Sequence, residues 1–398
     1  MIDKLLDPEV QKFIHDNESV DPFELSIKHQ SFKGIPFKFI AEQMISRKLA
    51  KSKLPEWYEA NGIVYPPKLS MEQCSSDLAA SYKASLVKGN SFIDLTGGMG
   101  VDTLAFSKHF KSGHYVERNP DLAELAHHNL TALGASNLTF ENKEAGTFLA
   151  SVQQPVDFIY IDPARRGTKD EKVFHFSDCE PNIIELQPLL LEKSNKIMVK
   201  ASPMLDIDLS IKSLAGIYEV HIVSINNECK EVLYVLDCEQ HDKVKIVTVN
   251  FRATVAESFA FYKEEEQNAK VTFSPPLRFL YEPNTSILKA GAFKVIGEHF
   301  NIKKLHRHAH LYTSETLVEN FPGRVFEIEQ AIPYNKKLVK KLIPEGKANI
   351  TTRNFKEEVS QIRKKTGLKD GGSKYLFATT GMDDKPMIII TKKVRENE

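Results

Sequence analysis

Three short segments of the chain combine residue types that could carry chemistry. The first, DLTGGMG at residues 94–100, joins an apolar strand pattern to a helical pattern. Glycines at such a bend let the backbone approach a ligand closely. Their spacing differs from the GxGxxG dinucleotide fingerprint, and the absence of a following Lys-Ser/Thr pair excludes a Walker loop. By itself the bend predicts no more than a ligand held against the backbone.

An acidic residue ends the next strand pattern. Glu117, in HYVERNP, lies 20 residues after Gly97. An acid at this place in a nucleotide-binding fold accepts hydrogen bonds from both hydroxyls of a ribose. Each bond to a charged acceptor contributes about 1.5–3 kcal/mol. We therefore expect Glu117 to bind a ribose; the alternative is a solvated surface glutamate.

The third segment, DPARR, follows the apolar run FIYI. Ligands bind at the carboxyl ends of strands in open α/β sheets, so Asp162, Pro163 and Arg165 are candidate catalytic residues. Arg165 and Arg166 could clamp a phosphate with parallel hydrogen bonds, or else pair with neighbouring acids. Lys200 ends a later strand pattern, where it could contact the substrate or form a salt bridge.

The hydrophobic pattern predicts the elements that position these segments. Strand patterns alternate with helical ones over residues 70–240, beginning with a helix over residues 71–86, which predicts a parallel sheet covered by helices on both faces. Two strands joined by a polar turn, in HIVSINNECKEVLYVLD, close this region as a hairpin. We therefore expect an α/β fold with a Rossmann-like seven-stranded core after a helical segment over residues 1–69. Residues 241–322 would form a connecting, ferredoxin-like region, and residues 323–398 a basic α/β module.

Charge separates the last part of the chain from the rest. The whole chain holds 53 basic and 53 acidic residues, but Ala331–Glu398 holds 16 basic and 8 acidic ones. A basic module on an acidic body fits a polyanion-binding role, although a solvated face would have the same composition. Near the N-terminus, lysines precede Trp57 and Tyr58, where a packed aromatic anchor is favoured over a nucleic-acid surface. The candidate substrate-binding residues of the basic module are Lys337, Lys341, Arg363 and Lys364.

Several classes of protein are disfavoured. The N-terminal MIDKLLDPEV lacks the regions of a signal peptide, and no apolar stretch reaches 18 residues. The four cysteines are scattered without a CxxC pair, which argues against a zinc ribbon or a thioredoxin-type site. His306, His308 and His310 alternate in LHRHAHLY and would share one face of a strand, but no acid or cysteine lies nearby in the sequence to complete a metal site. We expect a soluble cytoplasmic protein without a bound metal.

The three segments and the closing hairpin together resemble a class I S-adenosylmethionine-dependent methyltransferase. The resemblance covers about residues 70–240. It implies that the glycine bend passes under the methionine part of the cofactor, that the acid after the second strand holds the ribose, and that the segment after the fourth strand faces the transferable methyl. The residues implied at the cofactor are Asp94, Thr96, Gly97, Gly98, Gly100, Glu117 and either Asn142 or Lys143, with Asp162 near the methyl.

A closer resemblance is to a bacterial family of these enzymes that carries a C-terminal THUMP-like domain. It rests on LSMEQCSSDLAASYKA, DLTGGMGVDT, DPARRG, DCEPN, ANITTRNF and KYLFATTG, and it extends over most of the chain. Members of this family are generally taken to be RNA methyltransferases with S-adenosylmethionine as cofactor, although the substrate itself does not follow from the resemblance. The resemblance also implies that Glu72, Gln73 and Ser75 lie on a helix beside the cofactor cleft; the alternative is ordinary capping and surface polarity.

Departures from amino-methylating relatives bear on the reaction. Ala164 and Arg165 replace a proline and the aromatic residue that stacks on the base, so stacking would need the Arg165 guanidinium, Phe174 or Phe176. Methylation at carbon 5 of a pyrimidine needs a cysteine nucleophile. Neither DPARR nor KASPML contains one, and Cys179 is better explained as a buried small residue.

The expected function is therefore methylation of a base nitrogen in ribosomal or transfer RNA. The alternatives are a methyltransferase that acts on a protein or small molecule, and an inactive methyltransferase fold that serves as an RNA-binding protein. The polar segment Gly167–Glu180 is long enough to form a lid over the site, or it is a plain surface loop. The sequence leaves the oligomeric state open, including a homo-oligomer.

Overall fold

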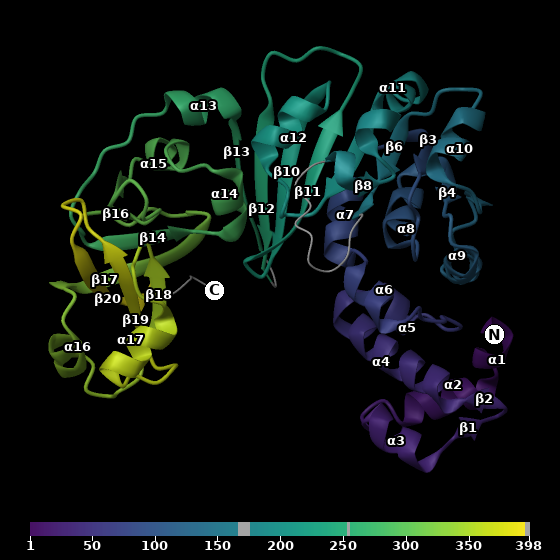
Figure 1. The fold of residues 1–398 in the computed structure, drawn as a ribbon, viewed down its shortest axis with the longest axis horizontal. Helices are drawn as coiled ribbons and strands as arrows, with labels where there is room; N and C mark the ends of the chain where they lie inside the picture. The colour runs from purple at the N-terminus through teal and green to yellow at the C-terminus, as the bar shows by residue number, and fades with distance from the viewer. Residues whose placement is uncertain (166–175, 253–254, 395–398) are drawn as a thin grey trace. The chain divides into compact units, whose positions relative to one another are not determined.

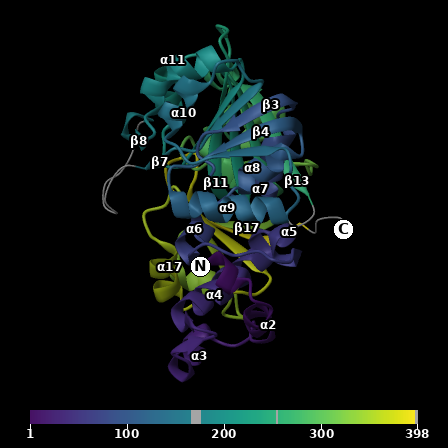
Figure 2. The same ribbon diagram turned by 90° about the vertical axis from the view of Figure 1, so that its right-hand side faces the viewer.

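The computed structural model describes residues 1–165, 176–252 and 255–394. The chain forms two compact units, which Figures 1 and 2 show as ribbons in two orientations. No helix of the described ranges is both long enough and apolar enough to cross a membrane. The first unit comprises Met1–Tyr218 and Leu233–His241, and the second comprises Glu219–Val232 and Asp242–Glu398.

A parallel sheet forms the centre of the first unit. Its strand order is β9-β6-β3-β4-β5, and Asp94 at the end of β3 lies in register with Tyr115 of β4 and Tyr160 of β6. The carboxyl ends of these strands therefore meet at one edge of the sheet. The strands are β3 (Gly89–Asp94), β4 (Phe110–Val116), β5 (Leu138–Glu141), β6 (Phe158–Ile161) and β9 (Ile197–Ala201).

The expected hairpin follows β9 and its helix. The sheet continues in the order β10-β11-β9, with β10 (Ile217–Ile225) and β11 (Glu228–Leu236) divided between the two units. Asn226 and Asn227 make the turn with positive φ, as two-residue hairpin turns require. The seven strands in this order confirm the expected Rossmann-like α/β core.

Helices cover both faces of this sheet, as Figure 2 shows. Residues of α7, α8 and α9 share one apolar cluster, whereas α10 and α11 pack against each other. Helices α8, α9, α10 and α11 return the chain between parallel strands, which is the alternation that the sequence predicted, whereas α7 leads into β3 and α12 into β10. The helices are α7 (Asp77–Ser85), α8 (Val101–Ser107), α9 (Pro120–Ala132), α10 (Ala145–Ser151), α11 (Ile183–Lys193) and α12 (Ile207–Ser213).

Short helices precede the core. The expected single helix over residues 71–86 is wrong, because the backbone is extended at Cys74 and Ser76 caps a new helix by accepting the N–H of Ala79. This break separates α6 from α7. The elements before it are α1 (Ile2–Leu5), α2 (Pro8–Asp16), α3 (Pro22–Lys28), β1 (Ser31–Phe32), β2 (Ile35–Pro36), α4 (Phe37–Lys53), α5 (Pro55–Glu59) and α6 (Lys68–Gln73).

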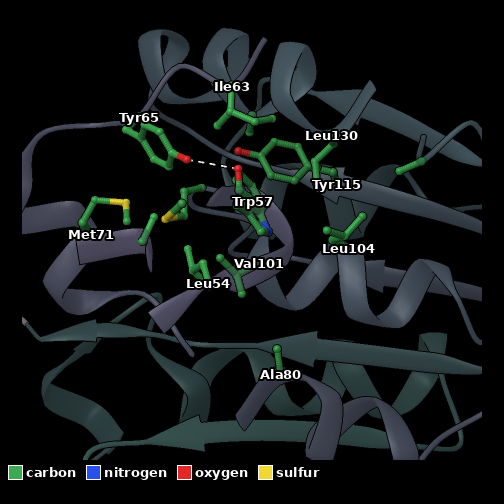
Figure 3. Close-up of a cluster of buried hydrophobic side chains, with 14 of the residues drawn as sticks. Leu54, Trp57, Ile63, Tyr65, Met71, Ala80, Val101, Leu104, Tyr115 and Leu130 are labelled. Atoms are coloured by element: carbon green, nitrogen blue, oxygen red, sulfur yellow. Dashed lines mark hydrogen bonds between the residues drawn. The ribbon is translucent and has the colours of Figure 1, made fainter. Parts of the chain in front are cut away.

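One apolar cluster ties the N-terminal helices to the core, as Figure 3 shows. The Trp57 side chain is fully buried in it, and the hydroxyl of Tyr65 donates a hydrogen bond to the Trp57 carbonyl at 3.0 Å. Val101 of α8 and Leu130 of α9 complete the cluster from the core side. Trp57 is therefore a packing anchor and not part of a nucleic-acid surface.

The second unit contributes strands to the edge of the nine-stranded sheet and holds a second sheet of its own. In the first, β12 pairs in parallel with β10 and antiparallel with β13. In the second, the order is β15-β16-β14-β17-β20-β19-β18, and only β18 and β19 pair in parallel among its described strands. The strands are β12 (Lys245–Phe251), β13 (Ala256–Tyr262), β14 (Phe279–Pro283), β15 (Lys303–Lys304), β16 (Tyr312–Ser314), β17 (Gly323–Pro333), β18 (Asn349–Arg353), β19 (Lys374–Thr380) and β20 (Pro386–Lys393).

The two basic helices of this unit share an apolar core with the second sheet. Val339 of α16 and Ile362 of α17 are fully buried in it beside Leu376 of β19. The described part of residues 323–398 is a mixed α/β module, as the sequence predicted. The domain boundaries expected at 69/70, 240/241 and 322/323 stay predictions. The helices of the unit are α13 (Lys263–Asn268), α14 (Thr285–Ala290), α15 (Val295–His299), α16 (Lys336–Leu342) and α17 (Val359–Thr366).

Candidate active site

The glycine bend runs from the end of β3 to the start of α8. The N–H of Gly97 donates to the carbonyl of Val116 at 2.8 Å, and a Cβ on Gly97 would lie 2.2 Å from the Tyr115 ring. Gly98 and Gly100 have φ of 56° and 89°, which non-glycine residues rarely adopt. The Tyr115 hydroxyl donates to the Gly98 carbonyl at 2.5 Å. Close packing and left-handed backbone thus explain why three glycines are needed here.

The buried Asp94 side chain holds this bend in place by hydrogen bonds. Its carboxylate accepts hydrogen bonds from the Thr96 N–H at 3.1 Å and from the Thr103 hydroxyl at 2.6 Å. Burial raises the pKa of the Asp94 carboxyl to about 7, against the hydrogen bond from Thr103, and the Asp102 carboxylate adds to the rise. Asp94 is 1 % exposed, so it holds the backbone of the bend and does not present its carboxylate to the surface.

Glu117 lies against the open side of the bend. Its carboxylate accepts hydrogen bonds from the Gly98 N–H at 3.0 Å and the Asn119 N–H at 2.8 Å. The Asn142 side chain donates to the Glu117 carbonyl at 2.8 Å, so the structure brings these three expected cofactor residues together. A Cβ on Gly98 would meet nothing closer than the Thr96 carbonyl at 3.8 Å. The space beside Gly98 is therefore open, and a ligand can approach the backbone there.

Asp162 follows β6 and is joined to the same bend. Its N–H donates to the Thr96 hydroxyl at 2.6 Å, which connects the third segment to the first. Its carboxylate forms a salt bridge with the Lys200 ammonium. Lys200 therefore belongs to the site, and it is paired with Asp162, the second of the two roles that the sequence allowed. Pro163 follows Asp162 directly and is half-buried.

Other expected residues lie elsewhere or beyond the described ranges. Arg165 lies in the short strand β7 (Ala164–Arg165), which pairs with β8 (Cys179–Glu180), and its side chain is not described. Arg166 and Phe174 fall outside the described residues, as does most of the expected lid. Phe176, in a 3-10 turn over Phe176–Asp178, is buried against the Tyr234 ring and is not available to stack on a base.

The segment before α7 also approaches the site. Gln73 ends α6 and is exposed, and Lys53 donates to the carbonyls of Met71 and Glu72 at 2.8 Å each, which holds the end of that helix. The Ser75 hydroxyl donates to the Asp102 carboxylate at 2.8 Å. Ser75 is therefore more than a helix cap, because it binds the first turn of α8.

Sequence reasoning missed the partners of Ser75. Lys83 is fully buried, and its ammonium lies 3.2 Å from one Asp102 oxygen and 3.0 Å from the Ser75 hydroxyl. The Tyr160 hydroxyl donates to the other Asp102 oxygen at 2.8 Å. One signal was present: Lys83 falls on the apolar face of α7 with Ala79, Ala80 and Ala84. A lysine on such a face needs a buried acid as its partner.

The basic residues of the second unit divide into two kinds. Lys337 and Lys341 on α16 and Lys364 on α17 are exposed. Arg363 instead is half-buried and forms a salt bridge with Asp370. The exposed lysines thus have the accessibility that a phosphate contact requires, whereas the Arg363 guanidinium is held by its own chain.

The expected strand through the histidine run is wrong. Residues 305–311 form a loop between β15 and β16. His306 is buried and lies 2.8 Å from an Asp384 oxygen and 3.0 Å from the Asn354 amide. His310 stacks on Phe293 with ring centroids 3.7 Å apart, and burial lowers its pKa to about 4. These contacts explain His306 as a hydrogen-bonding residue and His310 as a packing residue of a loop, not as parts of one face of a strand.

One group of described residues has the spacing of metal ligands. Ligand atoms of Asp237, Glu239 and His241 lie within 4.8 Å of one another. His241 pairs with Asp237 at 2.7 Å, and the Glu239 N–H donates to the same carboxylate at 2.8 Å. These contacts account for the geometry of the group, so we assign no metal to it.

This architecture is similar to that of known proteins. A ferredoxin-like domain model matches residues 279–322, and a THUMP domain-like model matches residues 323–393. The crystal structure of a protein described as a "putative methyltransferase" from Porphyromonas gingivalis W83 is 31% identical, with a TM-score of 0.87 over 97% of this chain and 98% of that chain.

A curated protein gives the same assignment at lower identity. It is described as an uncharacterised S-adenosylmethionine-dependent methyltransferase of Mycobacterium tuberculosis, from strains CDC 1551 and H37Rv. It is 21% identical over 307 residues, which are 75% of this chain and 80% of the relative. With the full-length match to the Porphyromonas structure, the chain belongs to the family of S-adenosylmethionine-dependent methyltransferases that carry ferredoxin-like and THUMP-like domains at the C-terminus.

Proposed function

We propose that this methyltransferase binds S-adenosylmethionine at the carboxyl edge of β3, β4 and β6 and methylates a base nitrogen of ribosomal or transfer RNA. The observation that carries the proposal is the single hydrogen-bonded cluster at that edge. The Gly98 N–H donates to the Glu117 carboxylate, and the Thr96 hydroxyl accepts from the Asp162 N–H. The residue proposed for the ribose of the cofactor and the residue proposed for the methyl acceptor are therefore both hydrogen-bonded to the glycine bend.

The residues at the bend fit this cofactor. The open side of Gly98 lets a methionine moiety lie against the backbone, and the oriented Glu117 carboxylate suits two ribose hydroxyls. Asn142, held by the Glu117 carbonyl, is the candidate for the adenine side. When bound, S-adenosylmethionine supplies an electrophilic methyl group on a sulfonium.

Asp162 is suited to handle the acceptor proton. A base nitrogen that carries an N–H loses this proton when it is methylated to a neutral product, and an acceptor within hydrogen-bond reach speeds this step. The Asp162 carboxylate would orient the nitrogen N–H, take its proton as the new N–C bond forms and the methyl–sulfur bond breaks, and pass that proton to solvent, while S-adenosylhomocysteine would be the leaving group. The Lys200 ammonium and the Thr96 hydroxyl hold Asp162 in place for this role.

Cys74 and Cys179 argue against a carbon-5 mechanism. That mechanism needs a thiolate that attacks the pyrimidine ring. Cys179 is 3 % exposed, and burial raises the pKa of the Cys74 thiol to about 11. Neither thiol is set up as a nucleophile at neutral pH, which favours a nitrogen acceptor.

The second unit supports RNA as the substrate. Exposed Lys337, Lys341 and Lys364 lie on the two helices of the THUMP-like match and can contact phosphates. Such contacts hold a nucleic acid without reading its sequence. The choice of nucleotide would then rest with the site at Asp162.

The test is transfer of a labelled methyl group from S-adenosylmethionine to protein-free total bacterial RNA. We expect labelled RNA with wild-type protein and at least about 100-fold less with Asp162→Asn. Asp121→Asn, at an exposed position on α9, is the matched control and should label normally. Cofactor binding without RNA labelling would reject the RNA proposal and favour a protein or small-molecule acceptor.

A further inference from the structure

A buried ionic network lies beside the proposed site and is not part of it. Lys83, Asp102, Ser75 and Tyr160, here called the Lys83–Asp102 network, come from four separate elements. Lys83 is fully buried on α7, and Asp102 lies in the first turn of α8. Ser75 joins the two charges, because its hydroxyl accepts from the ammonium and donates to the carboxylate.

The network reaches the site through Lys200. Burial is the largest single influence and by itself would raise the pKa of the Asp102 carboxyl, but the Lys83 and Lys200 ammoniums and the hydrogen bonds from Tyr160 and Ser75 together outweigh it, so the pKa falls below its ordinary value. Asp102 is therefore ionised, and it attracts the same ammonium that forms the salt bridge with Asp162. Lys200 therefore pairs with Asp162 and also contributes to the charge balance of Asp102.

Stability does not explain this arrangement. A buried ion pair replaced by well-packed apolar residues usually leaves a protein as stable or more stable. What an ion pair adds is a defined position for the elements that it joins. Here those elements are the segment Cys74–Ser76, the first turn of α8 directly after Gly100, and the end of β6 before Asp162.

We propose that Lys83 is a positioning residue of the methyl-transfer site. Its ammonium holds the Cys74–Ser76 segment against the first turn of α8, and by neutralising Asp102 it leaves Lys200 to Asp162. The second part rests on the proposed function, whereas the first concerns the fold alone.

Loss of the Lys83 charge has two consequences. Ser75 loses a donor, so the extended backbone at Cys74 is freed and its half-buried thiol becomes accessible. Asp102 keeps its charge but loses its main counter-ion, so Lys200 moves toward Asp102 and away from Asp162. The first effect appears in the thiol and the second in the rate of methyl transfer.

The first experiment measures alkylation of Cys74 by iodoacetamide, followed by peptide mass spectrometry. It needs neither cofactor nor RNA. We expect Lys83→Met to speed alkylation of Cys74 at least 10-fold while exposed Cys238 reacts as before. Lys304→Met is the control, because Lys304 is also buried but lies in the second unit. Equal Cys74 rates in wild type and folded Lys83→Met would overturn the proposal.

The second experiment measures binding of S-adenosylhomocysteine and methyl transfer to total RNA. We expect Lys83→Met to lower kcat at least 10-fold, with a smaller change in cofactor affinity. The double variant Lys83→Met/Asp102→Asn removes both charges and should recover part of that loss. A packing role alone predicts that the double variant is no better than the single one, and that result would overturn the electrostatic part.

Two further outcomes are separable. If wild-type protein binds no S-adenosylhomocysteine, the proposed function fails, while the Cys74 rates still decide whether Lys83 holds the segment. If Lys83→Met does not fold, Ser75→Ala removes one hydroxyl from the same network. We then expect a rise of about 3-fold or more in the Cys74 rate with Ser75→Ala, and an unchanged rate would overturn the proposal.

Discussion

The hydroxyl of Thr96 accepts a hydrogen bond from the backbone N–H of Asp162 at 2.6 Å. These residues are 66 positions apart, and each follows a different strand of the parallel sheet. The bond therefore couples the glycine bend, where we place the cofactor, to the carboxylate that we place at the acceptor. It makes Thr96 the link between the two halves of the proposed reaction.

This link can be removed without changing the shape of the side chain. Thr96→Val keeps the volume of the side chain but leaves the Asp162 N–H without its acceptor. The variant therefore loses one hydrogen bond. We expect kcat for methyl transfer to fall about 10-fold at saturating cofactor. Thr139→Val, at an exposed position on β5, should leave kcat unchanged. A normal kcat in Thr96→Val would show that Asp162 does not depend on the bend.

The ribose assignment depends on the charge of Glu117. Glu117→Ala removes a charged acceptor and also frees the Gly98 and Asn119 N–H groups. We expect affinity for S-adenosylhomocysteine, measured by titration calorimetry, to fall roughly 10- to 100-fold. Glu117→Gln retains one oxygen acceptor and should give an intermediate loss.

A matched control separates this effect from general charge removal. Glu124 is an exposed glutamate on α9, and Glu124→Ala should bind S-adenosylhomocysteine as wild type does. Unchanged affinity in Glu117→Ala would exclude Glu117 as the ribose acceptor, whatever the activity of the enzyme.

Much of this site follows from the sequence because its signals are local. Strand, turn and helix alternate over a few residues each, so the hydrophobic pattern alone places DLTGGMG, Glu117 and DPARR at strand ends. Parallel strands then bring their carboxyl ends to one edge, which accounts for the meeting of Gly98, Glu117 and Asp162. The Ser76 cap was also a local signal, in SSDLAA, but the helical pattern on both sides concealed it.

The sequence could not predict contacts between side chains that are far apart along the chain. The place of Lys83 on the apolar face of α7 signals a buried partner, but nothing in the nearby sequence identifies that partner as Asp102. The same holds for His306, whose partners Asp384 and Asn354 come from much later loops. The choice for Lys200 between substrate and salt bridge likewise needed the position of Asp162.

The buried Asp94 should make stability depend on pH. Burial raises its pKa to about 7, whereas in the unfolded chain an aspartate titrates near about 3.9. Between these values the folded protein holds a proton that the unfolded chain has released. The contribution of Asp94 to stability is therefore present at low pH and is lost as pH rises through about 7.

Asp94→Asn removes this dependence. We expect the unfolding free energy of wild type relative to the variant to fall by up to about 1.4 kcal/mol per pH unit between pH 5 and 7, then level off. The single tryptophan, Trp57, is buried in the first unit and reports its urea-induced unfolding by fluorescence. Exposed Asp121→Asn is the control. Parallel pH curves for wild type and Asp94→Asn would contradict the raised pKa.

The exposed lysines of α16 should act through RNA phosphates. Lys341→Glu should weaken binding to total RNA about 10-fold at low salt and reduce the slope of log K against log salt by about 0.7–0.9. The same charge change at Lys385, whose side chain is 80% exposed in the turn before β20, is the control. Equal salt slopes for wild type and Lys341→Glu would exclude α16 from the RNA surface.

Gly97 tests the close packing of the bend. A Cβ on Gly97 would lie 2.2 Å from a Tyr115 ring atom, so the ring must move and its hydrogen bond to the Gly98 carbonyl must break. We expect Gly97→Ala to lower the unfolding free energy by about 1–3 kcal/mol, followed by Trp57 fluorescence. Gly146→Ala is the opposite case, because Gly146 lies in α10 and its Cβ would meet only Leu186, at 3.3 Å. There alanine favours the helix, and stability should rise by up to about 1 kcal/mol. A Gly97→Ala protein as stable as wild type would show that the Tyr115 ring has room to shift, and that the bend does not need glycine at this position.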